Sequence, residues 1–464
     1  MTRCAYRVVS LILALVSLVA NSQTEQALPS SQTQNFFQQG LLLLEQNRPD
    51  AALEAFAGAE QQMPNDPRIQ NFRGIALTSL GRISEAASAY RRAIELDPKM
   101  VSAYRNLGFL EWTAHQTDNA RLHLGQALAL DSNDNFSRYY LGRIEVEVHR
   151  YDKAVEHFKQ LATSAGNDTS WAQLDLSLAY LYAGNFQDSI RVAKNVSEWT
   201  QTPSAQLASA YSIVGIANAR LGKPEQSIAA LRLAAEIAPE REENWLNLTR
   251  QLMDVNRFAE AVEAAQDGLK SSPKSYALHL RLGAAYFSSG RYNDAEKSFR
   301  ELVAAGDPLP TSYVGLAQVL LHTGRAAEAA AELSAAEEKL GPQFLLIYFR
   351  GLALNRAGNR EASLREFERA VQINPNSAEA HLGVGKTSLA LGRPSDAVRE
   401  LRKVIDLDPN NLPARRLLGQ AYRRLGDQEN AMKFATSAAD IEPEPRPDIV
   451  GDFLVPDWQD QSAR

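Results

Sequence analysis

The chain has 464 residues, a formal net charge of −6 and a single cysteine, Cys4. One cysteine excludes a disulfide within the chain and a metal site built from several thiolates. The acidic balance, with 49 basic against 55 acidic residues, excludes a general nucleic-acid binder, which needs a strongly basic surface.

Residues 1–22 have the pattern of a secretory signal peptide. Arg3 and Arg7 precede an apolar run over residues 8–20, and small residues then allow cleavage after Ser22. The apolar run has thirteen residues, too few for an ordinary membrane span, so an uncleaved anchor is the less favoured alternative. We therefore predict a secreted or periplasmic mature chain that has no cysteine and no stable membrane span.

A short polar linker at residues 23–32 precedes a pattern that recurs about every 34 residues. Residues 67–100 show it most clearly, as two short helical segments. Gly81 supplies the left-handed turn residue that ends the first segment. Pro98 follows the end of the second, because proline cannot continue the hydrogen-bond ladder of a helix. Each unit is therefore predicted to be a pair of antiparallel helices.

Two positions of this unit carry the period. Position 8 holds mostly small residues, namely Gly40, Gly74, Gly108, Gly142, Ser177, Gly215, Thr249, Gly283, Ala317, Gly351, Gly385 and Gly419. Position 20 is always Ala or Ser, namely Ala52, Ala86, Ala120, Ala154, Ser189, Ser227, Ala261, Ala295, Ala329, Ser363, Ala397 and Ala431. A period of 34 residues with two helices in each unit predicts a helical solenoid.

The full pattern has a small residue at position 8, Gly at 15, Ala at 20, an aromatic residue or Leu at 24, Ala at 27 and Pro at 32. It resembles the tetratricopeptide repeat (TPR). Position 24 is filled by Phe56, Tyr90, Phe158, Phe299 and Phe367. The resemblance covers about residues 33–445 and implies an all-α fold, a right-handed superhelical solenoid of about twelve TPR helix-turn-helix repeats. The family is a general binding scaffold, so it specifies a fold more closely than a function.

The array is predicted to be irregular at one internal place and at its end. The step between position-8 residues lengthens to 38 residues from Ser177 to Gly215, which indicates a longer loop or a subdivision near 198–207. Residues 446–464 break the pattern. We expect this C-terminal tail to cap the last repeat, with docking of a partner as the alternative.

The histidines have structural explanations. His115 and His149 occupy position 15, the turn, where a left-handed backbone is expected, so they are predicted to be turn residues rather than metal ligands. His279 and His381 occupy position 4, which the family fills with a large core residue. We predict that these two are structural histidines with satisfied ring nitrogens.

One stretch imitates a phosphate-binding loop, Gly385-Lys386-Thr387. That motif needs a glycine five residues before its second glycine, and Ala380 stands there. The stretch also falls inside a predicted first helix. No other catalytic pattern stands out, so we predict no enzyme activity, no cofactor and no metal.

The resemblance further implies that positions 2, 5, 9, 12 and 13 of the first helices line a concave groove. These positions carry ten basic and five acidic residues. We predict a partner-binding groove that includes Arg105, Phe109, Trp112, Phe136, Tyr139, Arg143, Trp171, Tyr182, Arg416, Arg423 and Arg424. In this hypothesis repeats three to five grip an apolar or aromatic segment while the last three arginines hold acidic groups. The alternative for each ring is packing between adjacent first helices.

The predicted function is that of a secreted or periplasmic TPR scaffold, which mediates protein–protein interaction through its groove. Its ligand would be a protein or peptide, an acidic one included, and not a nucleic acid. The alternative is a structural component of a cell-envelope assembly or polysaccharide-export machine that binds an anionic polymer or acidic peptide.

Overall fold

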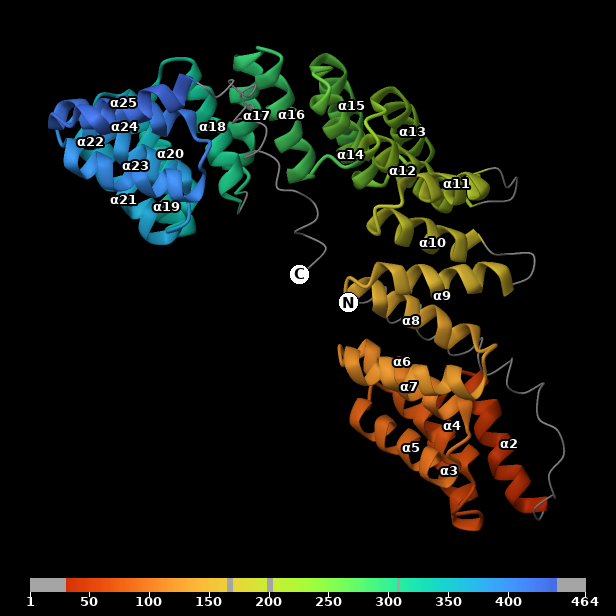
Figure 1. Cartoon of the computed structure of the whole chain (residues 1–464). Coiled ribbons are helices and arrows are strands. Elements are labelled where there is room, and N and C mark those ends of the chain that lie inside the picture. The colour runs from red at the N-terminus through yellow and green to blue at the C-terminus, as the bar shows by residue number, and fades with distance from the viewer. Residues whose placement is uncertain (1–30, 165–169, 198–202, 307–308, 440–464) are drawn as a thin grey trace. The chain divides into compact units, whose positions relative to one another are not determined.

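The computed structural model describes residues 31–164, 170–197, 203–306 and 309–439 (Figure 1). All regular secondary structure in these ranges is α-helical. The predicted signal peptide, most of the predicted linker and the C-terminal tail lie outside the described residues. None of the described helices combines the length and the hydropathy that a membrane crossing requires.

In the described ranges, 24 helices follow one another as sequential antiparallel pairs, one pair for each repeat. The first helices of the pairs are α2 (Ser31–Glu45), α4 (Pro67–Ser79), α6 (Val101–Thr113), α8 (Asn135–Glu147), α10 (Ser170–Tyr182), α12 (Ser204–Arg220), α14 (Glu242–Asp254), α16 (Tyr276–Ser288), α18 (Pro310–His322), α20 (Phe344–Arg356), α22 (Ala378–Ala390) and α24 (Leu412–Leu425). The second helices are α3 (Pro49–Gln62), α5 (Ile83–Leu96), α7 (Thr117–Leu130), α9 (Tyr151–Ser164), α11 (Phe186–Ser197), α13 (Pro224–Ile237), α15 (Phe258–Ser271), α17 (Tyr292–Ala304), α19 (Ala326–Leu340), α21 (Arg360–Ile373), α23 (Pro394–Leu407) and α25 (Gln428–Ala439). The predicted all-α class and the twelve helix pairs are confirmed.

The chain divides into two compact units, one ending at Leu221 and the other beginning at Gly222. Within each unit a helix contacts the helices that adjoin it in sequence, and first helices of successive repeats also touch, as in α4–α6–α8 and α16–α18–α20. Each repeat therefore covers the apolar face of its neighbour, and stability arises between adjacent repeats. The subdivision predicted near 198–207 falls partly outside the described residues and stays a prediction.

Left-handed residues separate the two helices of a repeat. Within the described ranges eight glycines at this turn have positive φ, among them Gly81 at 71°, and Gly306 and Gly341, which lie between repeats, have it too. In the described part of the chain four other residues share this conformation, namely Asn47 (54°), His115 (58°), His149 (58°) and Asn256 (61°). The prediction that both histidines are turn residues is confirmed.

Position 8 needs a small residue because the aromatic ring at position 24 packs directly against its Cα. A Cβ added to Gly142 would lie 2.7 Å from the ring of Phe158, closer than real Cβ contacts come. Phe158 is 1 % exposed, so its ring has no room to withdraw. The close approach of the two helices in a repeat therefore depends on the lack of a side chain at position 8.

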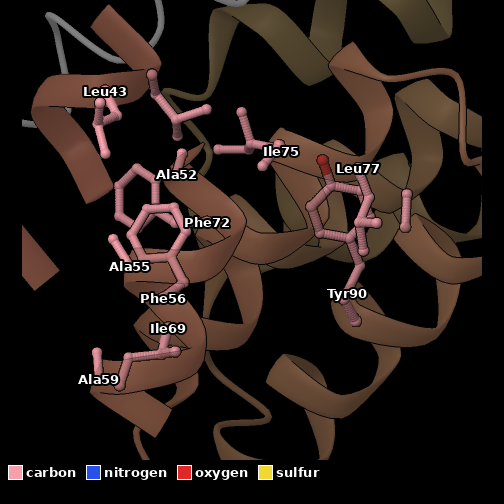
Figure 2. Packing of buried hydrophobic residues seen from close by; sticks show 14 of the residues in the cluster. Leu43, Ala52, Ala55, Phe56, Ala59, Ile69, Phe72, Ile75, Leu77 and Tyr90 are labelled. Carbon is pink, nitrogen blue, oxygen red and sulfur yellow. The ribbon is translucent and has the colours of Figure 1, made fainter. Parts of the chain in front are cut away.

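Figure 2 shows how one such core continues into the next repeat. Phe56 of α3 stacks on Phe72 of α4 with ring centroids 6.1 Å apart. Ala52 and Ala59 of α3 lie in the same cluster and are fully buried. Tyr90 of α5 belongs to the same cluster, which therefore includes both helices of the second repeat. Aromatic rings therefore link repeats as well as the two helices within one repeat.

Candidate functional site

First helices α6, α8 and α10 bring aromatic and charged side chains together in the first unit. We call this set the ring cluster; its members are Arg105, Phe109, Trp112, Phe136, Tyr139, Tyr140, Arg143 and Trp171. Tyr140 is its centre, with centroid distances of 4.6 Å to Phe136, 4.8 Å to Phe109 and 4.9 Å to Trp112. Seven of the eleven predicted groove residues thus meet in one place.

Tyr140 was missed because it occupies position 6, which is not among the groove positions. The next repeat has Asp175 at the same position, and this carboxyl also reaches the ring cluster. Position 6 therefore faces the neighbouring first helix closely enough to shape the groove. The adjacent pair Tyr139-Tyr140 was the one sequence signal for it, because consecutive helix residues point in different directions and only Tyr139 occupies a groove position.

The ring cluster has a buried layer and an open layer. Phe109 and Tyr140 are each 7 % exposed, so they pack between first helices and support the other rings. Trp112 and Tyr139 are partly exposed, and Trp171 is 37 % exposed. Tyr139 meets Trp171 edge to face at 5.2 Å. The side chains that a partner can touch are therefore those of the open layer.

Polar contacts hold the open layer in place. Arg143 donates a 3.1 Å hydrogen bond from Nη1 to the Tyr139 hydroxyl, which in turn hydrogen-bonds to Asp175. Burial raises the pKa of the Asp175 carboxyl above its usual range, although the charge of Arg143 and the hydrogen bond from Tyr139 act in the opposite direction. On the other side Trp112 donates from Nε1 to Glu147 Oε1 at 3.0 Å. The exposed rings are thus oriented before any ligand arrives.

Arg105 is not a free cation. Its Nη1 lies 3.3 Å from Asp134 Oδ1, and the two side chains are 15 % and 4 % exposed. Its guanidinium carbon lies 5.7 Å from the centre of the Phe136 ring. Arg105 therefore fixes Phe136 and neutralises Asp134. The arginines predicted to hold acidic groups are Arg416, Arg423 and Arg424.

The four remaining predicted groove residues lie elsewhere. Tyr182 stacks on Tyr151 of α9, with ring centroids 5.4 Å apart. Arg416, Arg423 and Arg424 belong to α24 of the second unit and are exposed. Arg423 donates from Nε to the carbonyl of Gly419 at 3.2 Å, and Arg424 donates to the carbonyl of Leu389. These backbone contacts hold two of the three guanidinium groups against the helices.

The stretch that imitates a phosphate-binding loop is the interior of α22. A Cβ on Gly385 would lie 2.6 Å from Leu401, so this glycine is the packing residue of its repeat. Thr387 is buried, and its Oγ1 accepts a 3.0 Å hydrogen bond from Asn355 Nδ2. A phosphate loop needs free backbone N–H groups, and those of a helix interior are already bonded within the helix.

His381 illustrates how the second histidine pair is used. Its Nδ1 lies 2.8 Å from Glu400 Oε2 and its Nε2 lies 3.0 Å from the carbonyl of Pro375. His279 contacts the carbonyl of Pro273 in the same way, at 3.1 Å. The prediction of a structural histidine with satisfied ring nitrogens is confirmed at His381, and at His279 the structure shows a partner for Nε2. Over the described ranges, no three His, Cys, Asp or Glu side chains are grouped so that they could hold a metal ion.

Comparison with known proteins identifies the repeat. One family profile described as tetratricopeptide repeat matches residues 37–101, 246–310, 285–343 and 348–411, and a second profile with the same description matches residues 388–449. Together they cover more than half of the chain.

Two similar curated proteins are each matched over only part of their own length. It is 24 % identical over 307 residues to cellulose synthase 1 operon protein C of Komagataeibacter xylinus, covering 64 % of this chain and 22 % of the relative. It is 25 % identical over 251 residues to the peroxisomal targeting signal receptor of Kluyveromyces lactis, covering 52 % and 42 %. The chain thus spans less than half the length of either relative.

Among solved structures, yeast Tom70 aligns over 89 % of this chain and 92 % of its own, with 17 % identity and a TM-score of 0.44.

Proposed function

The chain belongs to the tetratricopeptide repeat family, and we propose that it is a non-catalytic scaffold, secreted or periplasmic, that binds a protein partner on the ring cluster. The observation that carries this proposal is the open layer of Trp112, Tyr139 and Trp171. Glu147 holds Trp112, Arg143 holds Tyr139, and Tyr139 packs against Trp171. Trp, Tyr and Arg are the residue types that contribute most to binding energy at protein interfaces.

The arrangement favours an apolar or aromatic segment as the bound element. Rings that are already ordered lose little conformational entropy when a partner binds. Their edges and faces offer apolar area, while the indole N–H of Trp112 and the Tyr139 hydroxyl already have partners. An apolar segment of a protein would therefore match the exposed part of the ring cluster better than a highly charged one.

A second candidate is a structural role in a cell-envelope assembly or polysaccharide-export machine. Two observations favour it: the similarity to an operon protein of a cellulose synthase, and the exposed arginines of α24, namely Arg416, Arg423 and Arg424. An anionic polymer or an acidic peptide would pair with these arginines. Binding of that kind weakens as salt rises, whereas binding at the ring cluster depends little on salt.

The proposed function is tested by capture from the cells that produce the protein. The full mature chain serves as bait for the envelope and extracellular fractions, and bound proteins are identified by mass spectrometry. The double variant Trp112→Ala with Trp171→Ala removes two rings of the open layer. Its matched control, Leu122→Ala with Leu130→Ala, removes two apolar side chains of α7 that are 58 % and 43 % exposed. A partner that the control retains and the tryptophan variant loses supports the proposal; a partner that both retain contradicts it.

The proposed localisation has a separate test. If residues 1–22 are removed on export, the N-terminus of the protein from the producing cells is Gln23. N-terminal sequencing after cell fractionation measures this. An intact N-terminus in the cytoplasmic fraction would contradict secretion, but it would leave the proposed binding at the ring cluster unaffected.

A further inference from the structure

A cavity of about 450 Å³ opens on the first helices of the second unit. Helices α16, α18, α20 and α22 supply thirteen of its fourteen lining residues, and Phe367 of α21 supplies the other. Eleven of the fourteen occupy positions 2, 5, 9, 12 or 13 of their repeats, so the cavity lies where first helices are expected to meet a ligand. Its volume is in the range of known ligand pockets, about 300–1,000 Å³.

The cavity has an apolar part formed by one side chain from each of its four first helices. These are Phe287 of α16, Leu321 of α18, Leu352 of α20 and Leu382 of α22. An apolar side chain of a ligand that packs against these residues removes apolar surface from water. This part of the cavity therefore selects an apolar residue of the ligand.

Gln318 of α18 lines the same cavity, and its side chain has an unsatisfied hydrogen-bond acceptor. The residue is 8 % exposed, and its side-chain oxygen Oε1 is buried without a hydrogen-bond partner among the described residues. Buried carbonyl oxygens are nearly always hydrogen-bonded in folded proteins. A ligand that presents an N–H group in the cavity would satisfy this oxygen.

Cationic groups stand at the open side. Lys386 of α22 is exposed, and within the described ranges its ammonium makes no salt bridge. Arg356 of α20 is exposed too, and one of its guanidinium nitrogens donates to the carbonyl of Leu321 at 3.0 Å. Glu379 is the one acidic side chain in the lining, so the two cations leave an excess of positive charge. A carboxylate is the complementary group for this side of the cavity.

We propose that this cavity binds an extended peptide segment of a partner protein in which an apolar residue stands next to an aspartate or glutamate. The apolar side chain packs against the apolar part of the lining, to which Leu352 and Leu382 of the adjacent helices α20 and α22 belong. A backbone N–H of the peptide donates to Gln318 Oε1, and the acidic side chain pairs with the Lys386 ammonium. The proposal rests on the scaffold function proposed above but places a second binding site in the other unit of the chain.

Selection from a phage-displayed library of random dodecapeptides, with the full mature chain as target, tests the proposal. We expect the enriched peptides to share an apolar residue beside Asp or Glu. The best peptide is then synthesised with a fluorescent label, and its affinity is measured by anisotropy. Lys386→Ala should weaken binding roughly tenfold at low salt, and the difference should shrink as salt rises. Lys403→Ala, which removes an exposed lysine of the outer helix α23, is the matched control and should change nothing.

Gln318→Leu separates binding from folding. It removes the unpaired buried oxygen, so the free protein should melt at the same or a higher temperature while binding the peptide roughly tenfold more weakly, with no dependence on salt. A variant that melts lower and binds normally would overturn the assignment of Gln318. Unchanged affinity in Lys386→Ala, or enrichment of peptides without acidic residues, would overturn the proposal as a whole.

Failure of this proposal is distinguishable from failure of the proposed function. Peptides that need Trp112 and Trp171 but tolerate both cavity variants would refute the cavity and leave the ring cluster as the binding site. Peptides that need Lys386 and Gln318 but not Trp112 and Trp171 would support the cavity, and the ring cluster would still be tested by the capture experiment described above. A library with no enriched sequence would overturn the peptide as occupant, and self-association lost in Lys386→Ala would identify a second copy of the chain instead.

Discussion

Arg143 both donates a 3.1 Å hydrogen bond to the Tyr139 hydroxyl and lies 5.9 Å from the centre of the Tyr139 ring. One guanidinium thus holds a partly exposed ring by its polar end and contacts it through its π face. The same hydroxyl hydrogen-bonds to Asp175, so Tyr139 of α8 is linked to α10. Burial disfavours the charged form of the Asp175 carboxyl. The groove surface of these repeats is therefore coupled to a titrating group.

The first prediction concerns Asp175. Its pKa is raised in the folded chain above the unfolded value of about 3.9, so the folded state favours the protonated form. This contribution to stability is complete below about pH 4 and is lost as the pH rises through the folded pKa. Asp175→Asn has no charge to bury, so its stability relative to wild type should increase as the pH rises from about 4 to 7. Urea denaturation over a pH series measures this, and a stability difference that stays constant or falls would contradict it.

The second prediction uses two helical glycines with opposite surroundings. Gly142→Ala drives a methyl group into the Phe158 ring and should lower the free energy of unfolding by about 1–3 kcal/mol. Gly125 of α7 has no atom within 4 Å of where its Cβ would be, so Gly125→Ala should raise it by about 0.5–1 kcal/mol. Equal effects of the two substitutions in chemical denaturation would refute the role of position 8 described here.

Helix pairing could be predicted from the sequence because its determinants are local. The position-8 glycine and the position-24 ring lie sixteen residues apart in one repeat, as Gly142 and Phe158 do, and the period repeats them. The contacts between repeats were harder to predict. Tyr140 and Asp175 reach the ring cluster because successive first helices lie against each other, and no residue within one repeat encodes that rotation.

The partners of groove charges were also hard to predict from sequence, for the same reason. Arg105 was counted as a free cation, yet its partner Asp134 stands 29 residues later at the start of the next first helix. Arg424 keeps its charge, but its orientation also depends on a neighbouring repeat, because it donates to the carbonyl of Leu389 in the preceding one. A count of charged residues at the groove positions omits the partners that a neighbouring repeat supplies.

The third prediction addresses the turn histidines. His115 has a φ of 58°, which glycine adopts freely and a β-branched residue adopts only with strain of about 1–2 kcal/mol. His115→Gly should therefore melt close to the wild-type temperature, whereas His115→Val should melt clearly lower. Zinc and a chelator should leave the melting temperature of the wild type unchanged. A zinc-dependent rise that His115→Gly removes would show that the residue is a ligand after all.

The fourth prediction concerns the Gly385-Lys386-Thr387 stretch. Because it lies in the interior of α22, we expect no heat of binding when ATP and magnesium are titrated into the mature protein in a calorimeter. Saturable binding that disappears in Lys386→Ala would contradict this expectation. Binding that persists in that variant would place a nucleotide site elsewhere.

The central claim, that the ring cluster binds a protein partner, is tested most directly by titrating the captured partner into three forms of the chain in a calorimeter. The account predicts that Trp112→Ala with Trp171→Ala weakens affinity at least tenfold, since each tryptophan at an interface centre is worth more than about 1 kcal/mol. Helical content should stay the same, and Leu122→Ala with Leu130→Ala should bind as the wild type does. Equal affinity of all three forms for the partner would contradict the account.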